Sequence, residues 1–205
     1  MIPGEDLYYQ CPICGDYTRK GSLISGNTIG AKYYSDGKVI APMLPTFPMV
    51  SKCGSCGKLF WLKEQNKVEL DKLPDGTKAM SGETLTVYDY AQALRENLMT
   101  NKSEEKHLQL QIMWGYNDRV RKGRRLIAVE RDKLIWNENL MAMIELLDER
   151  DENDCIVMAE IHRYLGNFDR CKEIMSLLDQ ESFSSLIEIF GRECDAENRE
   201  VVVLS

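Results

Sequence analysis

The fold is decided by a short stretch, Lys52-Cys53-Gly54-Ser55-Cys56-Gly57-Lys58, and by its earlier counterpart, Cys11-Pro12-Ile13-Cys14-Gly15. Each stretch places two cysteines three positions apart and follows the second with glycine, which allows the positive φ of a tight turn. Two such turns supply four thiolates that close a tetrahedral metal site and leave no coordination position open. The spacing therefore predicts a structural Zn²⁺ site in a zinc ribbon, with the ligands Cys11, Cys14, Cys53 and Cys56.

Other interpretations of the two pairs stay open. Iron is the alternative metal, because rubredoxin-like sites also use four cysteines. The pairs could also be reduced and metal-free, or one of them could be a redox motif. Metal is favoured because an N-terminal part of about 80 residues with few large apolar side chains needs a staple to fold. The remaining cysteines have no metal-ligand spacing and are predicted to be buried small apolar residues: Cys155, Cys171 and Cys194.

Composition places the chain among ordinary globular proteins, with 205 residues, 43% of them apolar and 29% charged. It has no apolar run of membrane-spanning length, and the beginning at Met1 lacks the basic and apolar regions of a signal peptide. We therefore expect a cytoplasmic protein with no membrane partner. A reducing compartment favours metal binding over disulfides for its seven cysteines.

The two parts of the chain differ in texture. Residues 1–80 hold nine of the fourteen glycines and all six prolines, whereas residues 81–205 have none of the prolines and show long helical periodicity. We predict an α+β protein, with a β-rich zinc-ribbon domain at 1–80 and an all-α helical-hairpin domain at 81–205. The formal net charge is +2 for the first part and −9 for the second, so neither resembles a general nucleic-acid surface.

Local patterns predict the individual elements. Ser35-Asp36-Gly37 between β-prone runs indicates a hairpin over residues 31–41, and residues 60–62 indicate a strand. Thr86 with Asp89 resembles a capping box, and Asn101 is a second expected cap. The tail 201–204 is predicted to dock as a strand or to stay loose. Helices are expected at about 86–99, 102–122, 131–147, 153–165, 168–178 and 183–194, the third with a core face of Leu134, Leu140, Ile144 and Leu147.

The segment 159–175 resembles a tetratricopeptide repeat. Ala159 and Cys171 occupy the small-residue positions of its two helices, Gly166 lies at the turn and Phe168 fills the aromatic position. An ordinary antiparallel helical hairpin is the alternative, because no second repeat appears elsewhere.

The whole chain resembles a group of uncharacterised bacterial proteins with an N-terminal four-cysteine zinc ribbon and a C-terminal tetratricopeptide-like helical region. The resemblance rests on the motifs at 25–31, 35–37, 43–45, 52–61 and 114–118. It implies an architecture and adds little about function.

A second set of candidate residues lies at the end of the helix expected over 102–122. The aromatic and polar residues there indicate either a buried hydrogen-bond network or a groove, and the basic residues either bind a ligand or pair internally with acidic residues between 145 and 154. These candidates for a ligand or partner surface are Trp114, Tyr116, Asn117, Asp118, Arg119, Arg121, Lys122, Arg124 and Arg125.

The sequence favours a non-catalytic adaptor whose helical part binds a protein or peptide. The closed four-cysteine site and the missing catalytic motifs support this interpretation. The first alternative is nucleic-acid binding through the zinc ribbon, with a stripe formed by Arg19, Lys20, Lys32, Lys38, Lys52 and Lys58. The second is an enzyme or a metal sensor, which would need an open metal position or a pocket of perturbed titratable groups.

Overall fold

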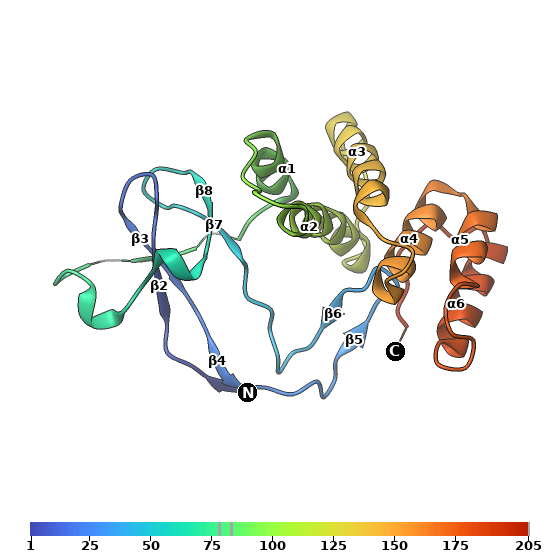
Figure 1. Cartoon of the computed structure of the whole chain (residues 1–205), viewed down its shortest axis with the longest axis horizontal. Coiled ribbons are helices and arrows are strands. Elements are labelled where there is room, and N and C mark those ends of the chain that lie inside the picture. The colour runs from blue at the N-terminus through green and yellow to red at the C-terminus, as the bar shows by residue number, and fades with distance from the viewer. Residues whose placement is uncertain (78, 83, 205) are drawn as a thin grey trace. The chain divides into compact units, whose positions relative to one another are not determined.

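The structure is a computed structural model that describes residues 1–77, 79–82 and 84–204. Small sheets form the N-terminal part and six helices follow among the described residues, which confirms the predicted mixed class (Figure 1). Two compact units form: the first comprises Met1–Ala31 with Ala41–Leu98, and the second Lys32–Ile40 with everything from Met99 onward. Within the described residues, no helix is both long and apolar enough to cross a bilayer.

The first unit is built on a four-stranded sheet with the strand order β10-β3-β2-β9. β2 and β3 form an antiparallel hairpin in which Tyr9 lies opposite Thr18. β9 extends the sheet beside β2, and β10 lies parallel to β3 on the other edge. The bounds are β2 (Leu7–Gln10), β3 (Tyr17–Lys20), β9 (Lys67–Val68) and β10 (Met80–Ser81).

Two further antiparallel pairs complete the first unit. β7 pairs with β8 in register Ser51 to Phe60, which confirms the strand predicted after the second cysteine pair. β1 pairs with β4 near the N-terminus. The bounds are β1 (Ile2–Pro3), β4 (Leu23–Ser25), β7 (Val50–Lys52) and β8 (Leu59–Trp61), with short 3-10 helices at Glu64–Asn66 and Leu70–Lys72.

One apolar cluster of these sheets contains cysteines of the predicted metal site. Its buried members are Tyr9, Cys11, Cys53 and Phe60, with Leu7 and Leu62 packed against them. A metal ion held by Cys11 and Cys53 would therefore be attached directly to the apolar packing of the sheets.

Helix α1 (Val87–Arg95) belongs to the first unit. The Thr86 side chain accepts a hydrogen bond from the Asp89 amide and the Asp89 carboxylate accepts one from the Thr86 amide, so the predicted capping box is confirmed. Lys52 on β7 lies 3.2 Å from the Asp89 carboxylate, and Trp61 on β8 donates to the carbonyl oxygen of Leu98. These bonds attach the helix to the β7–β8 hairpin.

The second unit contains five helices of the described chain. The amide oxygen of Asn101 caps the first of them as predicted, accepting from the Glu104 amide. Gly166 adopts φ 80° between two of the helices, a conformation open to glycine at little steric cost. The bounds are α2 (Lys102–Arg121), α3 (Glu130–Leu146), α4 (Glu152–Leu165), α5 (Phe168–Met175) and α6 (Ser184–Asp195).

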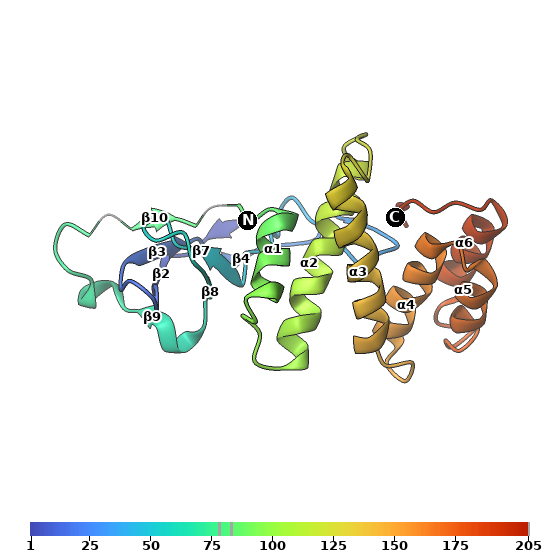
Figure 2. The same ribbon diagram turned by 90° about the horizontal axis from the view of Figure 1, so that it is seen from above.

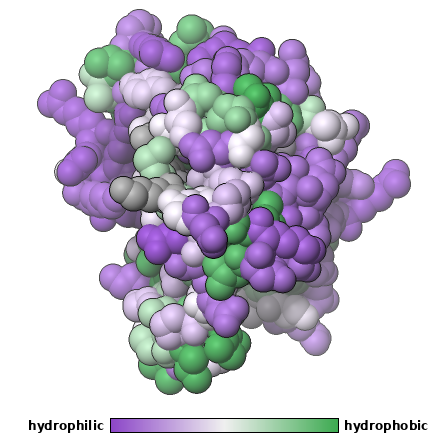
Figure 3. Space-filling view, turned by 90° about the vertical axis from the view of Figure 1, so that its left-hand side faces the viewer, coloured by the Kyte–Doolittle hydropathy of each residue, from purple (hydrophilic) through white to green (hydrophobic). Residues whose placement is uncertain are grey.

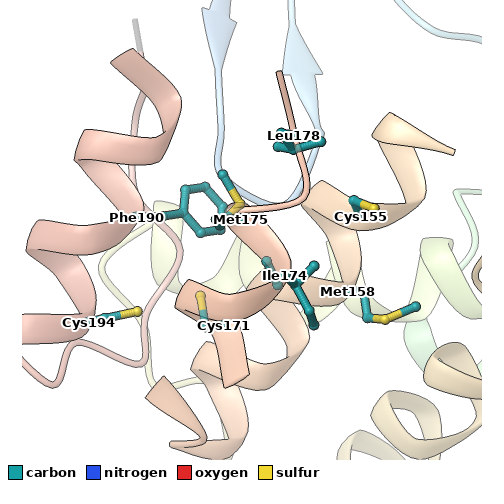
Figure 4. Packing of buried hydrophobic residues seen from close by; sticks show 9 residues of the cluster. Cys155, Met158, Cys171, Ile174, Met175, Leu178, Phe190 and Cys194 are labelled. Atoms are coloured by element: carbon teal, nitrogen blue, oxygen red, sulfur yellow. The ribbon is translucent and has the colours of Figure 1, made fainter. Parts of the chain in front are cut away.

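The last three helices, which follow one another in Figure 2, share an apolar core. Figure 4 shows side chains from α4, α5 and α6 directed into it, among them Ile174, Met175 and Phe190. Ala159 and Cys171 are fully buried in this core. The three cysteines outside the predicted metal site are all buried here, as expected: Cys155, Cys171 and Cys194.

The predicted core face of α3 is wrong for Leu134, which is 59% exposed. The buried stripe instead contains Asp132, Trp136, Asn139 and Met143, and Leu140 joins it as predicted. The cause is polar: Asp132 turns inward to accept hydrogen bonds from Arg119, and the amide group of Asn139 donates to Gln109. Those partners fix the rotation of the helix and leave Leu134 on its outer side.

The hairpin predicted over residues 31–41 is confirmed as β5 (Lys32–Tyr33) paired with β6 (Val39–Ile40). It packs with the helices of the second unit. The C-terminal tail docks beside it: Leu204 donates its amide to the Tyr33 carbonyl at 2.8 Å, and Tyr34 bridges Val203. The tail is therefore held beside β5 by an isolated antiparallel bridge and does not form a strand of its own.

The two histidines predict how stability depends on pH. Burial lowers the pKa of His107 and of His162 below the ordinary 6.5, and Arg170 adds to the effect at His162. Between the lowered pKa and 6.5 the unfolded chain binds more protons than the folded chain, so the histidines' contribution is present above pH 6.5 and lost as the pH falls. We expect the urea concentration at the unfolding midpoint to be lower at about pH 5.5 than at about pH 7.5. The drop should be smaller in the double variant His107→Gln/His162→Gln, and equal drops would contradict this assignment.

Candidate metal centre and the buried polar network

The two cysteine pairs lie at the turns of two hairpins, the first between β2 and β3 and the second between β7 and β8. The turns have the same backbone bonds. The Gly15 amide donates to the Cys11 carbonyl at 2.9 Å, and the Gly57 amide donates to the Cys53 carbonyl at 2.8 Å. Both glycines have positive φ, 78° and 70°, as predicted. Each turn therefore projects two thiols from a rigid loop.

The four thiols meet in space. All four Sγ atoms lie within 4.8 Å of one another, with 3.8 Å between Cys11 and Cys56 and 3.6 Å between Cys14 and Cys53. A disulfide would need about 2.05 Å, so these are separate thiol groups. Cys11 and Cys53 are buried, whereas Cys14 and Cys56 are exposed. The cluster can hold a metal ion.

Ionising Cys11 and Cys14 without a cation is unfavourable. The Asp16 amide favours the Cys14 thiolate, but desolvation and the neighbouring thiols outweigh it and raise its pKa to about 12. Burial raises the pKa of Cys11. Desolvation also opposes ionisation of Cys53, yet hydrogen bonds from the amides of Cys56 and Ser55 and from the thiols of Cys14 and Cys56 together lower the pKa of that thiol. A bound cation would remove this conflict by stabilising all four thiolates.

A hydrogen bond joins the two turns beside the sulfurs. The Ser55 hydroxyl donates to the Asp16 carboxylate, which also accepts from the Tyr17 amide at 2.8 Å. Both bonds lower the pKa of Asp16, and the bond from Ser55 has the larger effect. Gly54 faces the Met80 side chain so closely that a Cβ at this position would clash with it. A larger residue at position 54 would therefore have to displace the flexible end of the Met80 side chain, whereas the turn geometry itself favours glycine at Gly15 and Gly57.

The second set of candidates forms a buried polar network in the second unit. Asn117, almost fully buried, donates to the Asp36 carboxylate at 2.8 Å and to the Tyr164 hydroxyl at 2.9 Å. The Trp114 indole donates to the Asp36 carbonyl at 3.0 Å. Asp118 accepts from Lys38 of the hairpin at 2.7 Å. Of the two predicted alternatives, network or groove, these bonds of Trp114, Asn117 and Asp118 form a network.

For Arg119 and Arg121 the predicted acidic partners are wrong. Arg119 binds the Asp132 carboxylate at 2.7 Å, and its guanidinium carbon lies over the Tyr116 ring, 4.6 Å from the centroid. Arg121 binds Asp118 at 2.7 Å together with Asp36. None of these carboxylates lies between residues 145 and 154. In the antiparallel α2–α3 pair, the end of α2 lies beside the start of α3, far from residues 145–154. Three of the basic residues are exposed: Lys122, Arg124 and Arg125.

A neighbouring ion pair was not predicted. Arg163 and Glu160 on α4 are both buried, joined by bonds of 2.6 and 2.8 Å. Ser35 of the hairpin donates to Glu160 at 2.5 Å, and Arg163 donates to the tail carbonyls of Asn198 and Glu200. One helix turn thus holds both the hairpin and the tail. Only the Glu-x-x-Arg spacing in an apolar helix could have indicated it, and that spacing is equally common on solvated faces.

Removing the Asp36 carboxylate should destabilise the second unit. Asp36→Ala leaves the buried Asn117 amide and the Arg121 guanidinium, whose side chain is 5% exposed, without their shared acceptor. A buried donor that loses its partner costs about 1–3 kcal/mol, more when it is charged. Urea unfolding of Asp36→Ala measures the loss, with Asp75→Ala, an exposed aspartate in another turn, as the control. Equal midpoints for the two variants would refute the anchoring role of Asp36.

Comparisons with models of protein families, with curated proteins and with solved structures returned no match for this chain. The resemblance to bacterial proteins with a zinc ribbon and a tetratricopeptide-like region therefore stays a prediction. The residues themselves provide a four-thiol cluster able to bind a metal ion, followed by a helical region.

Proposed function

We propose that the four-cysteine cluster holds a structural Zn²⁺ ion. Zn–S bonds of about 2.3 Å place the corners of a tetrahedron about 3.8 Å apart, close to the 3.6 and 3.8 Å separations of two of the sulfur pairs. Four thiolates fill the coordination sphere, so the ion supplies folding energy to the first unit and offers no position to a substrate. Iron remains the alternative metal. Elemental analysis of purified protein distinguishes them, and less than one metal ion per chain would contradict the proposal.

The protein itself we propose to be a non-catalytic interaction protein whose helical unit binds a protein or peptide. The observation that best supports this proposal is the outer face of α3, where Leu134 is 59% exposed and Met141 is 57% exposed. Seven residues apart, they lie on the same side of the helix. Two large apolar side chains on one helix face are typical of helix-mediated recognition. The inner polar residues Asn117 and Arg121 already bind the chain's own hairpin.

The test compares two sets of variants in affinity capture from cell extract, quantified by mass spectrometry. Leu134→Ser/Met141→Ser should remove specific partners that the wild-type protein enriches, because it deletes the apolar contacts and leaves the buried face of α3 intact. Leu177→Ser, at another exposed leucine, is the matched control and should retain them. Identical enrichment for all three proteins would refute α3 as the partner surface.

The nucleic-acid alternative receives less support from the charges. Four residues of the predicted basic stripe form ion pairs with carboxylates of this chain. The pairs are Arg19 with Asp6 at 3.0 Å, Lys38 with Asp118, Lys52 with Asp89 and Lys58 with Glu96. The face of the molecule in Figure 3, at the end that carries β2 and β3, is mostly hydrophilic with separate apolar patches. Binding to DNA or RNA with a steep salt dependence near physiological ionic strength would favour this alternative over the adaptor.

A further inference from the structure

A cavity of about 310 Å³ lies in the first unit, away from the four thiols. It forms where the end of β3, the middle of β7 and the end of β10 meet the loop that precedes β7. A volume of this size is at the lower end of the range for small-molecule sites. Its lining residues are Asp6, Arg19, Lys20, Gly21, Phe47, Pro48, Ser51, Leu62, Ser81 and Gly82.

Lys20 contributes a cation to this cavity. It lies two residues after the buried Thr18 on β3, so its side chain leaves the sheet on the core side. Burial alone lowers its pKa, and no carboxylate of the described residues counteracts that shift. The other cation of the cavity, Arg19, is already bound to Asp6 at 3.0 Å and to the Ser81 hydroxyl at 2.9 Å. The Lys20 ammonium lies 5.9 Å from the centroid of the Tyr9 ring, and no ion pair joins it to a carboxylate of the described residues.

A buried hydroxyl is a second polar group of this cavity. Ser51 on β7 is 2% exposed, and its Oγ has no hydrogen-bond partner among the described residues. A Cβ on Gly82 would lie 2.6 Å from that oxygen, so only glycine at position 82 leaves the space beside it open. Buried hydroxyls without partners are uncommon, and a bound ligand is one way to satisfy them.

The remaining wall is apolar. Phe47 is half-buried and packs on Gly21, where a Cβ would lie 3.0 Å from the ring. Pro48 and Leu62 continue this wall. An aromatic and aliphatic wall opposite a few polar groups is the usual composition of a site for a small organic molecule, in which the polar groups orient the ligand.

We propose that this cavity binds a small organic anion. Its oxyanion group, a carboxylate or a phosphate, pairs with the Lys20 ammonium and accepts a hydrogen bond from the Ser51 hydroxyl, and its apolar body packs on Phe47. The site is independent of the adaptor role proposed for α3, and either can fail while the other holds.

The test is a titration of the metal-loaded full chain, followed by ¹H–¹⁵N NMR, with benzoate, phenyl phosphate, inorganic phosphate and benzyl alcohol. Saturable shifts of the Gly21, Ser51 and Gly82 amides are expected for the two aromatic anions. The relative affinities of benzoate and phenyl phosphate show whether the site prefers a carboxylate or a phosphate group. If inorganic phosphate binds as tightly as phenyl phosphate, the apolar wall does not contribute to binding. The proposal is overturned if neither aromatic anion saturates the site, or if benzyl alcohol binds equally well.

Three variants then locate the charge. Lys20→Met should weaken the tighter anion about tenfold, because a charge-assisted hydrogen bond is lost, whereas Lys20→Arg should restore most of the affinity. Lys72→Met removes an exposed lysine outside the cavity and should leave the affinity unchanged. Metal content and the amide spectrum without ligand confirm that each variant is folded. Unchanged affinity in folded Lys20→Met would assign the binding to another place.

Discussion

Replacing Cys53 by serine is expected to abolish metal binding and to unfold the first unit. Cys53 is buried and belongs both to the thiol cluster and to the apolar cluster of Tyr9 and Phe60. Three remaining thiolates and a hydroxyl bind Zn²⁺ far more weakly, because serine is a hard and weakly acidic ligand. Structural zinc contributes about 10–16 kcal/mol in small domains, more than the net stability of most domains of this size.

Metal content and amide spectra measure this result. Wild-type protein should carry one metal ion per chain, and Cys53→Ser less than a tenth of that, a loss of the order that the removal of one of four ligands implies. Amide signals of the β2–β3 and β7–β8 hairpins should collapse towards random-coil positions. The control is Cys155→Ala, which removes a buried thiol of the second unit and should keep the metal. A Cys53→Ser protein with full metal content would overturn the four-cysteine assignment.

The second large effect is expected at Arg163, whose side chain is 1% exposed. In Arg163→Met the buried Glu160 carboxylate loses its main counter-charge, and the Asn198 and Glu200 carbonyls lose their donor. Breaking a buried ion pair from one side costs about 3–5 kcal/mol, because the remaining charge stays desolvated. We expect the second unit to lose that much stability and the tail to detach from β5.

Urea unfolding monitored by far-UV circular dichroism measures the loss, and hydrogen exchange of the Leu204 amide reports on the tail. The double variant Glu160→Gln/Arg163→Met removes both charges and should recover part of the stability. Arg170→Met is the control: this arginine is 42% exposed and pairs with Glu149 and Glu173, so its loss should cost about 0–1 kcal/mol. Equal costs at positions 163 and 170 would show that the buried pair has no special weight.

The sequence predicts best where a feature is local. The Cys-x-x-Cys-Gly turns, the Asp-Gly hairpin and the Thr86 capping box each depend on a few consecutive residues, and the structure has them all. The clustering of the four thiols is nearly as predictable, because two matching Cys-x-x-Cys turns can together supply the four ligands of one metal ion. Spacing alone leaves the metal itself undetermined.

Long-range polar pairing is where sequence reasoning fails. Asp36 is a turn residue by its local pattern, and its bond to Arg121, eighty-five positions away, has no local signal. The same applies to Asp132, whose inward turn decides which side of α3 is buried and misplaces Leu134. Hydrophobic periodicity predicts that a carboxylate faces solvent. A carboxylate is buried only when a hydrogen-bonding or charged partner compensates for its desolvation, and the periodicity does not reveal that partner.

The assignment of residues 32–40 to the second unit has a consequence for how this protein can be divided. The polypeptide crosses between the units three times, after Ala31, after Ile40 and after Leu98. A recombinant fragment beginning at residue 81 would lack Asp36 and Ser35, so Arg121 would lose an acceptor and Glu160 would lose a donor. A cut at residue 81 therefore removes part of the polar network of the second unit, and a stable helical fragment would need residues 32–40 as well.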